Sequence, residues 1–120
     1  MVAFVLVFVV VTAAACHETP RDGFEAFYAA LADGSQQDAY ARLSNAAQAQ
    51  FAGVARAKGL EPSAYLASAF PKVTVRRIDV VDEHGDRAAV DVVDALGNHE
   101  RVQMVREDGR WRVDVMQGPQ

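Results

Sequence analysis

Residues 102–115 read Val-Gln-Met-Val-Arg-Glu-Asp-Gly-Arg-Trp-Arg-Val-Asp-Val, and this stretch decides the fold. At its centre, Asp108-Gly109 is a dipeptide typical of the tight turn between two antiparallel strands. On both sides of the turn apolar and polar residues alternate, which is typical of strands with one buried face. The apolar positions are Val102 and Met104 before the turn, and Trp111, Val113 and Val115 after it. The stretch therefore predicts the last hairpin of an antiparallel sheet.

The same period of two begins upstream, just after Pro71, where β-branched residues replace alanine. Val73 and Val75 are in one phase and Ile78 and Val80 in the other, so we expect a bulge near Arg76-Arg77 that curves the sheet. A turn through residues 83–86 and a hairpin at Gly97-Asn98 divide the rest into strands. The inner face of the second strand is expected to hold Ala88, Val90 and Val92. Together these patterns predict a meander of four antiparallel strands.

Helical spacing dominates the residues before Pro71. Thr19-Pro20-Arg21-Asp22 is typical of a capped helix start, and Gly34 supplies the stop. Phe24, Phe27, Tyr28 and Leu31 fall at i, i+3, i+4 and i+7 and form one buried stripe. A second helix is predicted within residues 35–59, and a short third one over Pro62–Phe70. The predicted fold is α+β: three N-terminal helices packed on a curved four-stranded antiparallel sheet.

Composition limits the function classes. The chain has 120 residues, with 12 Lys and Arg against 16 Asp and Glu, all of them after residue 16. Because the cations are scattered among acids, no nucleic-acid partner is expected. With one cysteine, the chain forms no internal disulfide and no thiolate zinc cluster, so Cys16 is explained by its position.

The first residues have the profile of an export signal. Val2–Ala15 is apolar, and as a helix it would span roughly 21 Å at 1.5 Å per residue, too short for a comfortable membrane span. The small residues before Cys16 suit a signal peptidase. We therefore expect a cleaved signal peptide over residues 1–15, a lipidated cysteine with a short linker over 16–20, and one α+β domain over 21–118.

Ala13-Ala14-Ala15-Cys16 resembles a bacterial lipobox, in which the cysteine is acylated and becomes the new N-terminus. It departs from the usual pattern at Ala13, where leucine is commonest, and the leader contains no Lys or Arg. The resemblance implies that lipid on Cys16 anchors the protein in a membrane of the bacterial cell envelope. His17 stands where an inner-membrane retention signal would place Asp, which favours the outer membrane facing the periplasm. The alternative is an ordinary secretory signal with a chance cysteine.

Three segments of the domain resemble small bacterial lipoproteins with the nuclear transport factor 2-like fold. They are Phe27-Tyr28-Ala29-Ala30-Leu31 with Asp33-Gly34, then Ala39-Tyr40-Ala41-Arg42-Leu43-Ser44, and the terminal Glu107–Val113 hairpin with its tryptophan. The resemblance implies a short version of a cone-shaped fold, with an apolar pocket at the wide end. The residues expected to line such a pocket are Phe27, Tyr28, Tyr40, Phe70, Val90, Val92, Met104 and Trp111.

No catalytic constellation stands out. An isomerase or dehydratase on this fold would need a carboxylate or histidine base in the pocket and a hydroxyl or acid opposite it. Asp94 with Tyr28 or Tyr40 is the best pair, although these residues are better explained as a turn residue and core tyrosines. His17, His84 and His99 fall in a linker and two turns without a carboxylate at ligand spacing, so no metal or other cofactor is expected.

We therefore expect a non-enzymatic, membrane-tethered accessory module. It would bind a small apolar ligand, or a partner protein or second copy through its sheet face. The alternative is a small pocket enzyme of the ketosteroid isomerase or dehydratase type. A buried polar group with a shifted pKa inside a cavity would favour the enzyme.

Overall fold

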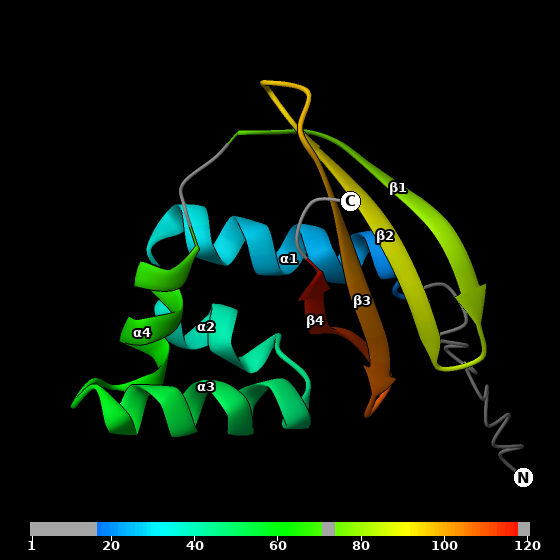
Figure 1. Ribbon diagram of the computed structural model, residues 1–120. Coiled ribbons are helices and arrows are strands. Elements are labelled where there is room, and N and C mark those ends of the chain that lie inside the picture. The colour runs from blue at the N-terminus through cyan, green and yellow to red at the C-terminus, as the bar shows by residue number, and fades with distance from the viewer. Residues whose placement is uncertain (1–16, 71–73, 118–120) are drawn as a thin grey trace, which may run out of the picture.

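The computed structural model describes residues 17–70 and 74–117, which form four helices followed by a four-stranded antiparallel sheet. The strand order is β1-β2-β3-β4, so the α+β class and the predicted meander are confirmed. Figure 1 shows a curved sheet with the helices on one side of it. The elements are α1 (Pro20–Asp33), α2 (Gln36–Ala41), α3 (Asn45–Ala57), α4 (Pro62–Ala69), β1 (Val75–His84), β2 (Arg87–Asp94), β3 (His99–Glu107) and β4 (Arg110–Gln117).

The predicted ends of α1 are confirmed. The Thr19 hydroxyl accepts a hydrogen bond from the Asp22 amide, and the Asp22 carboxylate accepts one from the Thr19 amide. At the other end, Gly34 adopts the left-handed conformation, with φ of 80°. Glu18 and Pro20, which were expected in a linker, are packed against the domain, and Pro20 is buried.

The second predicted helix is two helices. The chain leaves the helical path between α2 and α3, where Leu43 forms a parallel bridge to Val113 of β4. The Ser44 amide donates to the Val113 carbonyl, and the Val113 amide donates to the Arg42 carbonyl, both at 2.8 Å. Ser44 then caps α3 by accepting from the Ala47 amide. At this break, residues 42–44 pair with the edge of β4 that does not face β3. The predicted second helix is therefore divided in two, and the expected count of three helices was wrong.

Two bulges change which residues of β1 face the core. The register passes from Val75 opposite Asp94 to Arg77 opposite Val93, which confirms a bulge at Arg76. A second register shift, between Val80 and Asp82, was not predicted. Another shift at Asp114 interrupts the strict alternation expected through β4. Val73, assigned to the first phase of β1 from the sequence, lies outside the described residues.

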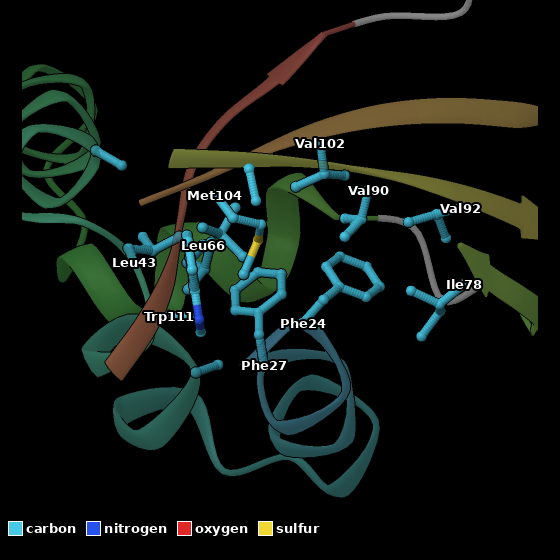
Figure 2. Close-up of a cluster of buried hydrophobic side chains, with 14 residues drawn as sticks. Phe24, Phe27, Leu43, Leu66, Ile78, Val90, Val92, Val102, Met104 and Trp111 are labelled. Carbon is cyan, nitrogen blue, oxygen red and sulfur yellow. The ribbon is translucent and has the colours of Figure 1, made fainter. Parts of the chain in front are cut away.

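The core lies between α1 and the inner face of the sheet. Figure 2 shows Phe24 and Phe27 of α1 pointing toward Val90, Val102 and Met104 of the strands. Trp111 of β4 lies beside Leu43 and Leu66 from the helical side. The predicted inner positions Ala88, Val90 and Val92 are buried. The tryptophan of the terminal hairpin therefore joins the helices to the sheet, and the alternation in residues 102–115 correctly predicts that it faces inward.

Candidate functional site

A pocket of about 310 Å³ lies between α1, α4 and the inner face of the sheet, and it is the candidate site. Its volume is at the lower end of small-molecule sites in proteins. The wall consists of Phe24, Phe27, Tyr28, Leu31, Ala32, Gly34, Gln36, Ala67, Phe70, Thr74, Val75, Val92 and Glu100. Most of these side chains are apolar, so the pocket suits a ligand with an apolar body.

The helical side of the wall follows from the spacing of the α1 stripe. Because Phe24, Phe27, Tyr28 and Leu31 share one helix face, they all reach this pocket. Phe70, just after α4, meets the ring of Phe27 edge to face, with ring centroids 5.6 Å apart. Phe70 also stacks on Phe51 of α3, at 6.1 Å. These ring contacts hold the aromatic wall in place.

Glu100 of β3 is the one acidic side chain among the described residues of this wall. It lies opposite Val92 in the β2–β3 register, and therefore shares the inner face with Val92 and Val102. The side chain is half-buried, and burial raises the pKa of its carboxyl group above 4.5. No hydrogen bond or ion pair joins the Glu100 side chain to another residue in the described part of the chain. The alternation that places Val102 and Met104 inside could have identified Glu100, which we did not select from the sequence.

Four of the eight residues expected to line a pocket lie on this wall: Phe27, Tyr28, Phe70 and Val92. Val90, Met104 and Trp111 are instead fully buried in the core. Tyr40 lies elsewhere, and its hydroxyl donates to the Gln48 carbonyl at 2.8 Å. The Tyr28 hydroxyl accepts a hydrogen bond from the Val75 amide at 3.3 Å, at the start of β1.

Asp94 is a turn residue, as its position at a strand end suggests. Its carboxylate accepts from the amides of Leu96 and Asn98, both at 2.9 Å, and from the Asn98 side chain. These bonds lower the pKa of Asp94, with the bond from the Asn98 amide contributing most. Asp94 is not on the pocket wall, so the candidate pair of Asp94 with a tyrosine is not assembled.

Two histidines have carboxylate partners, and both lie at strand ends rather than in the expected turns, since His84 ends β1 and His99 begins β3. The His99 Nδ1 lies 2.9 Å from Asp91, its diagonal neighbour across the β2–β3 pair, and His84 Nε2 lies 2.8 Å from Asp82. Sequence spacing missed the first pair because the hairpin brings residues 91 and 99 together. Within residues 17–70 and 74–117, no three His, Cys, Asp or Glu side chains are grouped to hold a metal ion.

The N-terminal end of the domain is tied down by Glu18. Its carboxylate accepts a hydrogen bond from the Trp111 amide at 3.0 Å and forms an ion pair with Arg42. Cys16, two residues earlier, lies outside the described residues. Among the helices that the structure describes, none has the length and hydrophobicity needed to cross a bilayer.

A second hollow, between α1 and α2, is more open to solvent. Alanines and charged side chains line it, including Asp33, Asp38, Arg42 and Arg110. It offers a ligand little apolar surface, so the pocket beside Glu100 is the better candidate.

Comparison with known proteins gives no relative: no protein family, no curated protein and no solved structure matches the chain.

Proposed function

We propose that this protein is a membrane-tethered lipoprotein whose domain binds a small apolar ligand in the pocket beside Glu100. The observation that carries the proposal is the pocket itself, with a volume of about 310 Å³ and a mainly apolar wall. Such pockets bury most of a small ligand and use a few polar groups to orient it. The outer sheet face is less suited to a partner, since it carries the charged groups Arg77, Asp79, Asp91 and His99 in ion pairs.

The leader supports the tether, and Glu18 limits how far the domain would lie from the lipid. Acylation of Cys16 would leave only His17 between the lipid and a residue bonded to Trp111 and Arg42. Two residues extend at most about 7 Å. The domain would therefore sit directly on its membrane, and His17 favours the outer membrane, facing the periplasm.

A short version of the nuclear transport factor 2-like cone is the fold that we propose within the α+β class. It is supported by the curved meander, by the helices on one side of it and by the pocket between the helices and the sheet. The terminal tryptophan packed against α1 is also consistent with this fold.

Intact mass spectrometry of protein from the membrane fraction of a bacterial host tests the tether. We expect a species that begins at Cys16 and carries diacylglycerol, and its loss in Cys16→Ala. An unlipidated product, or one that retains Val2–Ala15, would contradict the lipoprotein proposal.

Titration with a neutral apolar dye, N-phenylnaphthylamine, tests ligand binding. Ala67→Phe places a ring at the pocket wall and should abolish dye fluorescence, whereas Ala69→Phe, exposed on the same helix, should leave it unchanged. Equal binding by both variants would contradict the pocket as the binding site.

One observation favours the enzymatic alternative, namely the raised pKa of Glu100 inside the pocket. A carboxylate with a raised pKa is a suitable base for moving a proton next to a carbonyl group. Deuterium exchange into a β,γ-unsaturated ketone measures this activity directly. Exchange above background that disappears in Glu100→Gln would establish the isomerase type, and its absence supports a binding module.

A further inference from the structure

We propose that the pocket selects amphiphiles that carry a protonated primary amine at the end of an apolar chain, and that Glu100 binds the ammonium group. This inference rests on the proposed ligand-binding function. It adds the chemical class of the ligand and the residue that recognises it.

The charged group on the pocket wall favours a ligand that carries a positive charge. Among the residues of the wall that lie within 17–70 and 74–117, Glu100 is the only ionisable group other than Tyr28, and none of them is Lys, Arg or His. The other polar side chains on the wall, Gln36 and Thr74, are neutral. A ligand that carries one positive charge would therefore pair with the acidic group of the described wall.

The position of Glu100 makes it available to a ligand. Glu100 shares the inner face of β3 with Val102 and Met104, which are both fully buried. An apolar residue would therefore be expected at position 100. The Glu100 carboxylate has no hydrogen-bond or ion-pair partner within the described residues. Departures from local folding rules concentrate at functional sites, and a partly buried carboxylate facing a pocket is such a departure.

An ammonium group suits this carboxylate better than a hydroxyl group does. Both groups can donate a charge-assisted hydrogen bond to the carboxylate, but only the ammonium group adds the Coulomb attraction between opposite charges. Burial, which raises the pKa of Glu100, penalises its charged form, and a bound cation relieves that penalty.

The same carboxylate excludes the opposite class of amphiphile. A fatty acid that enters with its head group toward Glu100 would place two carboxylates side by side, which is unfavourable. The pocket is therefore expected to discriminate between chains of the same length by the charge of the head group.

Isothermal titration calorimetry with octylamine, octanol and octanoate tests this selectivity, because the three probes share one chain. We expect octylamine to bind at least about tenfold more tightly than octanol, which corresponds to about 1.4 kcal/mol. Octanoate should bind more weakly than octanol. In Glu100→Gln, octylamine should lose about tenfold in affinity, octanol should stay within about twofold, and octanoate should gain.

Glu83→Gln is the matched control, because Glu83 is an exposed strand glutamate outside the pocket. It removes the same charge from the chain and should leave all three affinities unchanged. Equal losses of octylamine affinity in Glu83→Gln and Glu100→Gln would overturn the role of Glu100. Equal affinities of octanol and octylamine in the unaltered protein would overturn the selectivity while leaving the proposed function intact. Failure of all three probes to bind would overturn the proposed function itself.

Discussion

Gly23 in α1 lies against the backbone of Trp111 in β4: a β-carbon on Gly23 would stand 2.5 Å from the Trp111 carbonyl oxygen. This close approach lets the first helix pack directly on the last strand. We expect Gly23→Ala to destabilise the protein by about 1–3 kcal/mol, although alanine is the better helix former. Urea unfolding followed by circular dichroism measures the change.

Gly53 in α3 is the matched control, because nothing lies within 4 Å of a β-carbon placed there. Gly53→Ala should stabilise the protein by about 0.5–1 kcal/mol, the gain expected inside a helix. Stabilisation by both substitutions would show that α1 and β4 do not pack as closely as described.

Glu18 holds the start of the domain to β4 and to the turn before α3. Glu18→Ala removes the acceptor for the Trp111 amide and the partner of Arg42, so we expect a loss of about 1–3 kcal/mol in unfolding free energy. Glu25→Ala breaks an exposed ion pair with Arg21 and should cost less than about 0.5 kcal/mol. Similar losses in the two variants, measured by urea unfolding, would contradict the anchoring role of Glu18.

The Ser44 hydroxyl connects α3 to β4. The Ser44 Oγ accepts from the Ala47 amide and donates to the Asp114 carboxylate at 2.6 Å, while the residue is 1% exposed. We expect Ser44→Ala to lower the melting temperature, with a loss of about 2 kcal/mol in stability. Ser35 caps α2 without a side-chain hydrogen bond, so Ser35→Ala should change little. A loss in Ser35→Ala as large as that in Ser44→Ala would contradict this assignment.

Local signals predicted the elements that depend on neighbours in sequence. Neighbouring residues alone determine the capping box at Thr19 and Asp22. The same holds for the positive φ angles of Asp108 and Gly109 in the last hairpin. The bulge at Arg76 was also visible, because the phase of the apolar residues changes there. Such features follow from backbone chemistry and periodicity alone.

The break between α2 and α3 has no comparable signal. It depends on the bridge from Leu43 to Val113, which are 70 residues apart in the chain, and the alanines around it favour a continuous helix. Glu100 was missed for another reason, since a charged residue near a strand end is usually exposed. Its inward position follows from the same alternation that places Val102 and Met104 inside, and the pairing opposite Val92 agrees with it.

The cost of placing Glu100 on the inner face should appear in the pH dependence of stability. Because burial raises its pKa above 4.5, the folded protein binds this proton more tightly than the unfolded chain does. Stability is therefore lost as the pH rises from about 4.5 through the raised pKa. Glu100→Gln has no such titration, so it should equal the unaltered protein at low pH and exceed it at neutral pH. The gain should stay below about 1 kcal/mol, because solvent screens a half-buried carboxylate.

Urea unfolding of both proteins between about pH 4 and pH 7 checks this difference. The lowered pKa values of Asp22 and Asp94 destabilise the folded state only as the pH falls, and they cancel because both proteins contain these residues. Glu83→Gln, exposed on β1, should show no comparable gain at neutral pH. A glutamine variant less stable than the unaltered protein at pH 7 would mean that ionised Glu100 has a stabilising partner, and the carboxylate would then serve the fold rather than a ligand.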